Sequence, residues 1–104
     1  MNIEKILNGT ELTIALDGRL DANTADELET EIVNSLEGIT SLIIDLDKLE
    51  YVSSAGLRVF LLTYKKMVKQ GEMKMINAND DVMSIFEMTE FTDILDINKK
   101  EEIK

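Results

Sequence analysis

Apolar and polar residues alternate near the start of the chain, and this alternation predicts two β-strands. Leu12, Ile14 and Leu16 are separated by Thr13 and Ala15, a pattern typical of a strand with one solvent-facing side. We expect the strands over residues 2–7 and 11–17. Asn8-Gly9 stands between them, and this pair favours the positive φ angles of a tight hairpin turn. The two strands should therefore pair antiparallel.

A helical repeat follows the second strand. Leu28, Ile32 and Leu36 recur at the spacing of one helical turn. The segment Thr24-Ala-Asp-Glu27 has the sequence of a capping box, in which the Thr24 hydroxyl accepts the backbone N–H of Glu27. These features predict a first helix from Thr24 to about Leu36, ended by Gly38 in the left-handed conformation.

The middle of the chain predicts a buried strand followed by a long helix. Apolar residues are consecutive rather than alternating over residues 41–46, which indicates a central strand covered on both faces. The helix is expected over about residues 55–69, closed by Gly71, with lysines in its last turns where cations suit the helix dipole. Its expected inward residues are Leu57, Leu61, Tyr64 and Val68.

The last third of the chain predicts three further elements. These are a strand over 73–77, a helix over 80–88 capped by Asn79 with Val82, Ile85 and Phe86 inward, and a short strand containing Ile94, Leu95 and Ile97. Residues 98–104 read as a polar tail with one frayed helical turn. The order ββαβαβαβ predicts a single α/β domain over residues 1–104. Its mixed sheet has four or five strands, an N-terminal antiparallel hairpin, later parallel strands and a cover of three or four helices.

The composition restricts the class of partner. The 104 residues contain 21 acidic and 11 basic side chains, a formal charge of −10. Clustered Lys and Arg bind nucleic acids and anionic membranes, so this charge argues against both. It is compatible with a basic protein partner, or with a role of the acids in solubility alone. No cysteine, no signal-peptide pattern and no apolar run near the ~20 residues of a membrane span occur, so we expect a cytoplasmic protein without membrane insertion.

The residues that most enzyme classes need are missing. The chain has no histidine, which excludes His-based triads and His metal sites, and it has no glycine-rich phosphate loop. We therefore expect neither catalysis nor a cofactor. Asp45 and Asp47 form a carboxylate pair that suits Mg²⁺, but a turn at Asp47 with Asp45 facing solvent or an N–H is the favoured interpretation. The spacing of Met67, Met73, Met75, Met83 and Met88 fits core filling better than a methionine-rich surface.

Two adjacent serines, Ser53 and Ser54, stand between the central strand and the long helix. The first N–H groups of a helix lack internal partners and the helix dipole is positive there, so a hydroxyl at this place can act as a cap or can carry a phosphate. One serine suffices as a cap. Gly56 lies in the first turn, where glycine is unfavourable in a helix. Either another backbone approaches the serines closely or the turn packs tightly on its own sheet.

The segment DLDKLEYVSSAGLRVFL resembles the signature of the STAS domain of bacterial anti-sigma-factor antagonists. Further matches are Gly18-Arg-Leu-Asp21 followed by Thr24-Ala, Gly71 after the long helix, and Ile85-Phe86-Glu-Met-Thr before Phe91, so that the resemblance covers about residues 10–97. It implies that Ser54 is a phosphoacceptor and that Asp21 contacts a kinase partner. An alternative for Asp21 is a loop carboxylate bonded to local N–H groups.

Three positions depart from the family pattern. Ser53 stands where the motif has aspartate, Ala55 where it has a second hydroxyl residue, and Glu90 where a glycine is usual near the third helix. Ser53 is thus a second candidate acceptor.

The resemblance also implies a mechanism. A surface of Asp21, Ser53, Ser54 and Gly56 would bind an anti-sigma factor that is also a serine kinase, and binding would release the sigma factor. Phosphorylation of Ser54 would end this binding, and a PP2C-type phosphatase would restore it. Alternatives are a structural STAS subunit of an ABC-type lipid transporter and a phospho-switched regulator of another output. We expect a monomer or a weak dimer.

Overall fold

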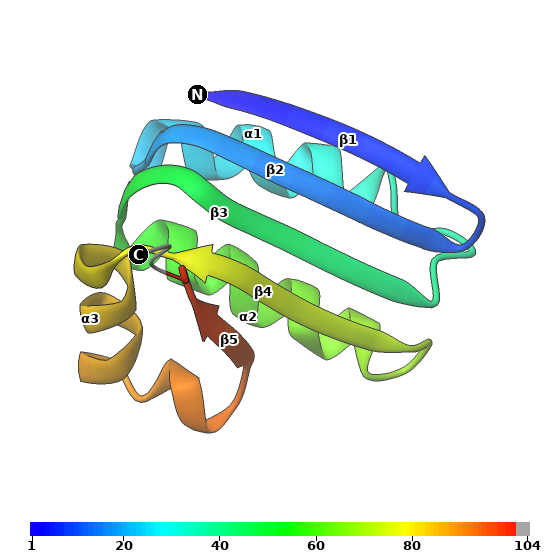
Figure 1. The fold of residues 1–104 in the computed structure, drawn as a ribbon. Helices are drawn as coiled ribbons and strands as arrows, with labels where there is room; N and C mark the ends of the chain where they lie inside the picture. The colour runs from blue at the N-terminus through cyan, green and yellow to red at the C-terminus, as the bar shows by residue number, and fades with distance from the viewer. Residues whose placement is uncertain (102–104) are drawn as a thin grey trace.

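Five strands form one mixed sheet in the order β1-β2-β3-β4-β5 (Figure 1). The computed structural model of the protein describes residues 1–101. Its elements are β1 (Asn2–Asn8), β2 (Glu11–Leu20), α1 (Ala22–Val33), β3 (Ser41–Val52), α2 (Ser54–Met67), β4 (Glu72–Ala78), α3 (Asp80–Met88), a 3₁₀ turn (Phe91–Asp93) and β5 (Asp96–Lys99). β1 pairs antiparallel with β2, and each later strand pairs parallel with the one before it. The predicted order, fold class and hairpin are confirmed.

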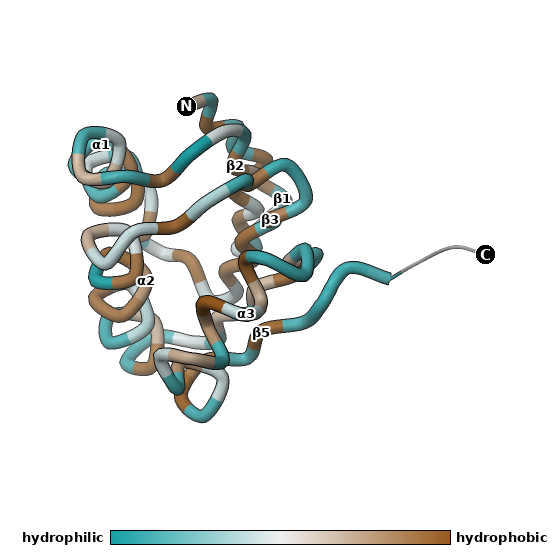
Figure 2. The backbone as a smooth tube through the Cα atoms, turned by 90° about the vertical axis from the view of Figure 1, so that its left-hand side faces the viewer, coloured by the Kyte–Doolittle hydropathy of each residue, from teal (hydrophilic) through white to brown (hydrophobic). Residues whose placement is uncertain are grey.

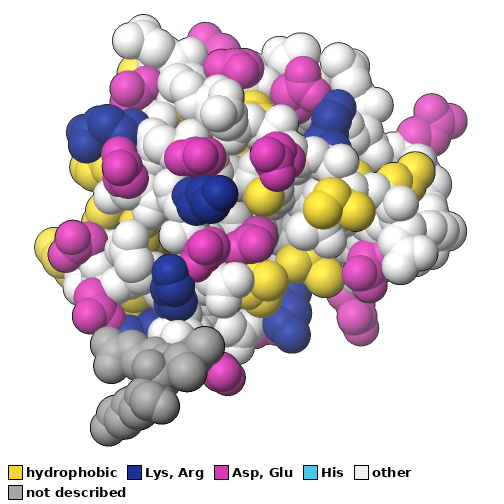
Figure 3. Space-filling model, turned by 45° about the horizontal axis from the view of Figure 1, so that its top comes forward, with side chains coloured by type: hydrophobic (Ala, Val, Ile, Leu, Met, Phe, Trp, Pro, Cys, Tyr) yellow, Lys and Arg dark blue, Asp and Glu magenta, His cyan; other side chains and the backbone are white. Residues whose placement is uncertain are grey.

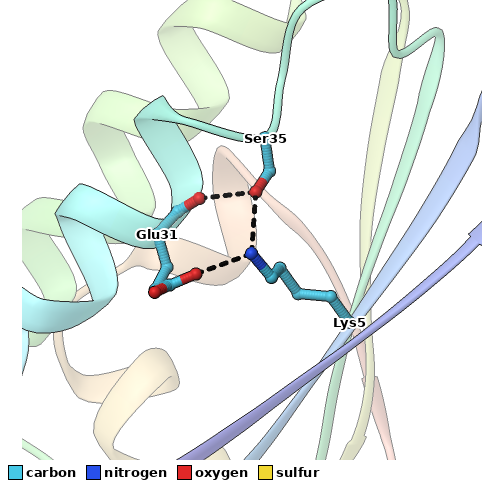
Figure 4. Close-up of polar contacts among 3 residues, drawn as sticks. All are labelled: Lys5, Glu31 and Ser35. Atoms are coloured by element: carbon cyan, nitrogen blue, oxygen red, sulfur yellow. Dashed lines mark hydrogen bonds and ion pairs between the residues drawn. The ribbon is translucent and has the colours of Figure 1, made fainter.

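The hairpin turn forms as expected from its glycine. Asn8 pairs with Glu11 and Gly9 has a φ of +64°, a conformation that costs glycine little. β1 is an edge strand, and its side chain Lys5 reaches across to α1 (Figure 4). The Lys5 ammonium lies 2.7 Å from a Glu31 carboxylate oxygen and 3.4 Å from the Ser35 hydroxyl. This partly exposed contact links the edge strand to the end of α1.

The helices α1 and α2 cover one face of the sheet, as Figure 2 shows. Alternate residues of the strands point into this layer: Leu12, Ile14 and Leu16 from β2, Leu42, Ile44 and Leu46 from β3, and Met75 from β4. Phe86 of α3 joins the same core, with its ring centroid 6.0 Å from that of Phe60. On the face drawn in Figure 3, acidic and basic side chains are interspersed among scattered apolar ones.

The expectation that the central strand is covered on both faces is wrong. Over residues 41–47, β3 alternates between half-buried and buried residues, because the helices lie on one side only. Ile43, which the consecutive apolar run placed in the core, faces the other side and is half-buried. β3 and β2 also run further than predicted, to Val52 and Leu20, and their longer pairing carries register shifts after Ala15 and Gly18.

The start of the first helix differs from the prediction. α1 begins at Ala22 with Asp21 as its N-cap, so Thr24 is the third helical residue rather than the cap. The capping box therefore joins Asp21 and Thr24, and Glu27 has no part in it. The helix ends at Val33, and Gly38, with a φ of +79°, lies in the following loop. Leu28, Ile32 and Leu36 are buried as expected.

The inward face of α2 is one row away from the predicted one. The buried row contains Gly56, Phe60, Thr63 and Met67, with Leu57 and Val59 beside it. Leu61 and Tyr64 are only half-buried, and Val68 is 55% exposed. Glycine and threonine carry no hydrophobic signal, so the periodicity of the larger apolar residues indicated the wrong row. The helix spans Ser54–Met67, and Gly71 closes it without a positive φ.

The C-terminal region is partly as predicted. Asn79 caps α3 by accepting the Val82 N–H at 2.8 Å, and Val82 and Phe86 are buried while Ile85 is half-buried. The last strand begins at Asp96, after Ile94 and Leu95, because its pairing with β4 joins Lys74 to Asp96 and Met75 to Ile97. Asn98 and Lys99 thus belong to β5 rather than to a helical tail, and the last three residues of the expected tail lie outside the described residues.

The methionines mostly fill the core, as predicted. Met67 and Met75 are fully buried, and Met73 and Met83 pack against the core from its margin. Met88, at the end of α3, is 83% exposed and does not follow this pattern.

Candidate functional site at the start of α2

The parallel strands bring the starts of the three helices to one edge of the sheet, on the left of Figure 1. β2 leads directly into Asp21, β3 into Ser53 and β4 into Asn79, and each of these residues is the N-cap of the next helix. Leu20 and Val52 are register partners, and the Ser53 N–H donates to the Leu20 carbonyl at 2.8 Å. The caps of α1 and α2 are therefore neighbours. Ligands and partners of parallel sheets commonly bind outside this carboxyl edge.

Ser53 is the N-cap of α2. Its backbone is extended, with φ −89° and ψ 173°, and its hydroxyl oxygen accepts the Gly56 N–H at 3.3 Å. Its carbonyl accepts the first intrahelical bond, from the Leu57 N–H at 2.9 Å. The side chain is half-buried. The capping role that the sequence left open for this pair of serines thus belongs to Ser53.

Ser54 is the first residue of α2 and is exposed. Within residues 1–101, its hydroxyl makes no hydrogen bond to another residue. It stands where the helix dipole is positive and where the first N–H groups have no intrahelical partners. A phosphoryl group on this exposed residue would therefore meet a favourable field.

Gly56 is explained by packing on its own sheet. A Cβ at this position would lie 2.6 Å from Leu20 Cγ and 2.9 Å from Val52 Cγ2, closer than real Cβ contacts. The glycine lets the first turn of α2 lie directly on the ends of β2 and β3. Of the two interpretations left open by the sequence, tight packing of the turn is confirmed.

Asp21 caps α1 and directly follows Leu20, whose carbonyl accepts the Ser53 N–H. Its carboxylate accepts the N–H groups of Thr24 at 3.0 Å and Asn23 at 2.9 Å, and its own N–H donates to the Thr24 hydroxyl at 2.9 Å. These bonds, first that from Thr24, together with the positive charge of Arg19, hold the pKa of Asp21 below its ordinary value. The interpretation of Asp21 as a carboxylate bonded to local N–H groups is confirmed.

Arg19 and Tyr51 are two residues of this edge that the sequence analysis missed. They are register partners on β2 and β3, and the Arg19 guanidinium lies 4.6 Å from the centre of the Tyr51 ring. Such a cation–π contact holds an exposed arginine in one place. No local signal announces it, because the pairing depends on a register that includes two shifts.

The carboxylate pair of β3 is occupied by protein groups. One Asp45 oxygen accepts the Asp47 N–H and the Asn77 side-chain amide, both at 3.0 Å, as the favoured interpretation of an N–H partner requires. Asp47 lies within β3 instead of opening a turn, and it pairs with Lys100 at 2.6 Å. Among residues 1–101, no three His, Cys, Asp or Glu side chains gather in a way that would hold a metal ion.

Glu90 occupies a left-handed position with a φ of +61°. This is the position where the resembled family usually has glycine, and the backbone keeps the glycine-like conformation despite the substitution. Non-glycine residues in this region store strain.

In the part of the chain that the structure describes, no helix is both long and apolar enough to cross a membrane.

Comparisons with known proteins agree with this architecture. The family model described as STAS domain matches residues 2–102. The anti-sigma-B factor antagonist of Bacillus subtilis is 31% identical over 103 residues, covering 98% of this chain and 94% of the relative. The protein of the same name from Listeria monocytogenes is 33% identical over 93 residues, covering 86% and 81%.

Among solved structures, the anti-sigma factor antagonist SpoIIAA resembles the chain in fold. Its unphosphorylated form aligns with a TM-score of 0.72 at 14% identity, covering 99% of this chain and 90% of that one. The phosphorylated form of SpoIIAA, a Bacillus cell fate determinant, aligns with the same TM-score at 15% identity, covering 92% and 90%.

Proposed function

Because this chain belongs to the STAS domain family, we propose that it is an anti-sigma factor antagonist whose binding is switched off by phosphorylation of Ser54. Unphosphorylated, it binds an anti-sigma factor that is also a serine kinase and so releases the sigma factor. Relatives named anti-sigma-B factor antagonist, which align over most of their length, support this proposal. Since sigma factors act with RNA polymerase, this function places the chain in the cytoplasm.

The observation that carries the proposal is the division of roles between the two serines. Ser53 is held in the cap, while Ser54 presents an exposed hydroxyl one residue further on. A kinase needs an accessible acceptor oxygen, and the exposed Ser54 offers one at the carboxyl edge of the sheet. Its modification leaves the capping bond of Ser53 in place, so the fold should tolerate the phosphate.

The binding surface is centred on Ser54 and includes Ser53 and Asp21. Gly56 is buried, so it contributes through shape: it lets α2 lie close to β2 and β3 and thereby sets the position of Ser54. Asp21 presents a carboxylate held in a fixed orientation by two N–H groups. In this proposal Asp21 contacts the kinase while remaining the cap of α1.

The chemistry belongs to the partners. The Ser54 oxygen bonds to the γ-phosphorus of ATP, the bond from that phosphorus to the β–γ bridging oxygen breaks, ADP leaves, and a base of the kinase takes the hydroxyl proton. The phosphate adds about −1.5 to −2 charges at the interface. A loss of ~3 kcal/mol would weaken binding more than 100-fold. A phosphatase of the PP2C type hydrolyses the phosphoserine and restores binding.

Binding of Ser54 variants to the cognate anti-sigma factor tests the proposal. Ser54→Ala should bind with or without ATP, because it cannot be phosphorylated. Ser54→Asp should stay folded and bind at least about 10-fold more weakly, since a carboxylate imitates part of the phosphate charge. Ser84→Asp is the matched control, because Ser84 is an exposed serine within α3.

Three outcomes would contradict the proposal. The first is a Ser54→Ala protein that binds no better than phosphorylated protein. The second is an unphosphorylated chain that stays bound to an ABC-type ATPase instead of an anti-sigma factor, which would select the structural-subunit alternative. The third is a Ser54→Asp protein that fails to fold, which would show that Ser54 is mainly structural.

A further inference from the structure

Arg58 lies one helical turn after Ser54 on the solvent-facing side of α2. Both residues are exposed, and four positions along a helix bring two side chains to about 5–6 Å between their Cβ atoms. Side chains of a helix lean towards its N-terminus, so a long side chain at Arg58 covers the turn that contains Ser54. The guanidinium is thus within reach of a group attached to the Ser54 hydroxyl.

The Arg58 guanidinium has no ion-pair partner among residues 1–101. It borders a hollow of about 60 Å³ between α1 and α2, where Asp26 and Glu29 of α1 and Ala55 of α2 also lie. These two carboxylates line the same hollow as Arg58, but neither forms an ion pair with it. Arg58 is therefore a cation whose charge is available to a stronger anion.

The other cations in this region are placed less well than Arg58 to reach a phosphate on Ser54. Arg19 lies against the ring of Tyr51, and Lys65 is eleven residues along α2, or about 16 Å at the rise of a helix. The negative groups that face this region are Asp21, Asp26 and Glu29 of the neighbouring segment, and each carries a single charge. A phosphoserine dianion would attract Arg58 more strongly than any of them.

We propose that Arg58 binds the phosphoryl group of phosphorylated Ser54 and holds it against the first turn of α2. A planar guanidinium donates two parallel N–H bonds to phosphate oxygens, a geometry that lysine does not offer. Phosphorylation then changes the binding surface in two ways: it adds negative charge, and it pairs the positive charge of Arg58, which is no longer available to a partner. This inference rests on the proposed function, in which Ser54 is the modified residue.

The ionisation of the phosphate tests the inference directly. Phosphoserine is installed at position 54 during translation, so that no kinase is needed, and its second pKa is measured by ³¹P NMR titration. Removing Arg58 in Arg58→Gln should raise this pKa by at least about 0.3 units, because the arginine favours the dianion. Arg58→Lys should give an intermediate value.

Lys65→Gln is the matched control, because it removes one positive charge from the same exposed side of α2. We expect the second pKa of the phosphoserine in this variant to agree within about 0.1 units with that of the phosphorylated protein that carries no other substitution. Equal midpoints for Arg58→Gln and Lys65→Gln would overturn the inference. Circular dichroism of the unphosphorylated variants shows whether the helix is intact, since both replaced side chains are exposed.

The same proteins separate this inference from the proposed function. If phosphoserine at position 54 abolishes binding to the anti-sigma factor but Arg58→Gln leaves the midpoint unchanged, only the role of Arg58 is wrong. If the midpoint shifts but the phosphorylated protein still binds the anti-sigma factor, Arg58 holds the phosphate and the proposed switch is wrong.

Discussion

The two ends of α2 are both built around a glycine, and they differ in what the glycine meets. At the start, Gly56 packs on the side chains of Leu20 and Val52, while Ser54 beside it is exposed. At the far end, a Cβ on Gly71 would lie 1.9 Å from the carbonyl oxygen of Thr40, which is backbone. Gly56 thus positions the exposed start of α2, whereas Gly71 brings the loop before β4 against the loop before β3.

Hydrogen bonds show the same contrast. The Gln70 side-chain amide donates to the carbonyls of Leu36 and Ile39, both at 2.7 Å, and the Glu72 N–H donates to the Thr40 carbonyl at 3.0 Å. These bonds use the polar groups of the far end inside the domain. At the start, only Ser53 is used in this way, and the Ser54 hydroxyl is left to solvent. The start of α2 thus presents a polar group to solvent, whereas the far end does not present the groups named here.

The largest expected effect is a loss of stability at the far end of α2. Gly71→Ala should lower the free energy of unfolding by about 3 kcal/mol or more, since the Thr40 backbone must move to admit the methyl group. Gly56→Ala is the control: its methyl group meets side chains rather than backbone, and alanine favours a helix, so a smaller loss of about 1–2 kcal/mol is expected. Urea denaturation measures both, and equal losses would contradict the contrast between the two ends.

A smaller effect should separate the two serines. Ser53→Ala removes the cap of α2 and should lower the free energy of unfolding by about 1 kcal/mol. Ser54→Ala removes an exposed hydroxyl without a bond in the described chain and should change it by less than about 0.5 kcal/mol. Thermal denaturation of both variants checks the assignment of Ser53 as the cap. A greater loss of stability in Ser54→Ala than in Ser53→Ala would contradict it.

The smallest expected effect concerns acid stability at Asp21. Its pKa is lowered in the folded state, so its contribution is present above the ordinary value of 3.8 and is lost as the pH falls through the lower folded value. Asp21→Asn keeps an oxygen that can cap α1 but cannot ionise. The melting temperature of the parent relative to this variant should therefore fall as the pH is lowered from 5 to 2.

Asp26→Asn, a replacement at an exposed carboxylate of the same helix, controls for the change in net charge. If Asp21→Asn and Asp26→Asn change the fall in melting temperature between pH 5 and pH 2 by the same amount, the capping bonds of Asp21 do not account for its lowered pKa.

The order of elements was predictable because each signal was local. The Asn8-Gly9 turn, the alternation around Ile14 and the Asn79 cap each lie within a few residues, and all are confirmed. The cap of α1 was misplaced because Asp21 and Thr24 are both good capping residues. Which of them acts depends on where β2 ends, and β2 runs on to Leu20.

The candidate site was predictable in part. The strand–serine–helix order placed both serines at a helix start, but nothing in the sequence decides which one caps. That decision follows from the bond between the Ser53 N–H and the Leu20 carbonyl, which fixes the end of β3. The Arg19–Tyr51 contact and the neighbourhood of Asp21 and Ser53 depend equally on the register of β2 and β3. Such non-local pairing is invisible in a single sequence.

The most direct test of the account is the position of a phosphate after incubation with the cognate kinase and ATP. Intact mass and fragment mapping should show one phosphoryl group on Ser54 in the parent, the same group in Ser53→Ala, and none in Ser54→Ala. A phosphate mapped to Ser53, or a chain that stays unmodified while the kinase is active on another substrate, would contradict the claim that the exposed hydroxyl of Ser54 is the switch.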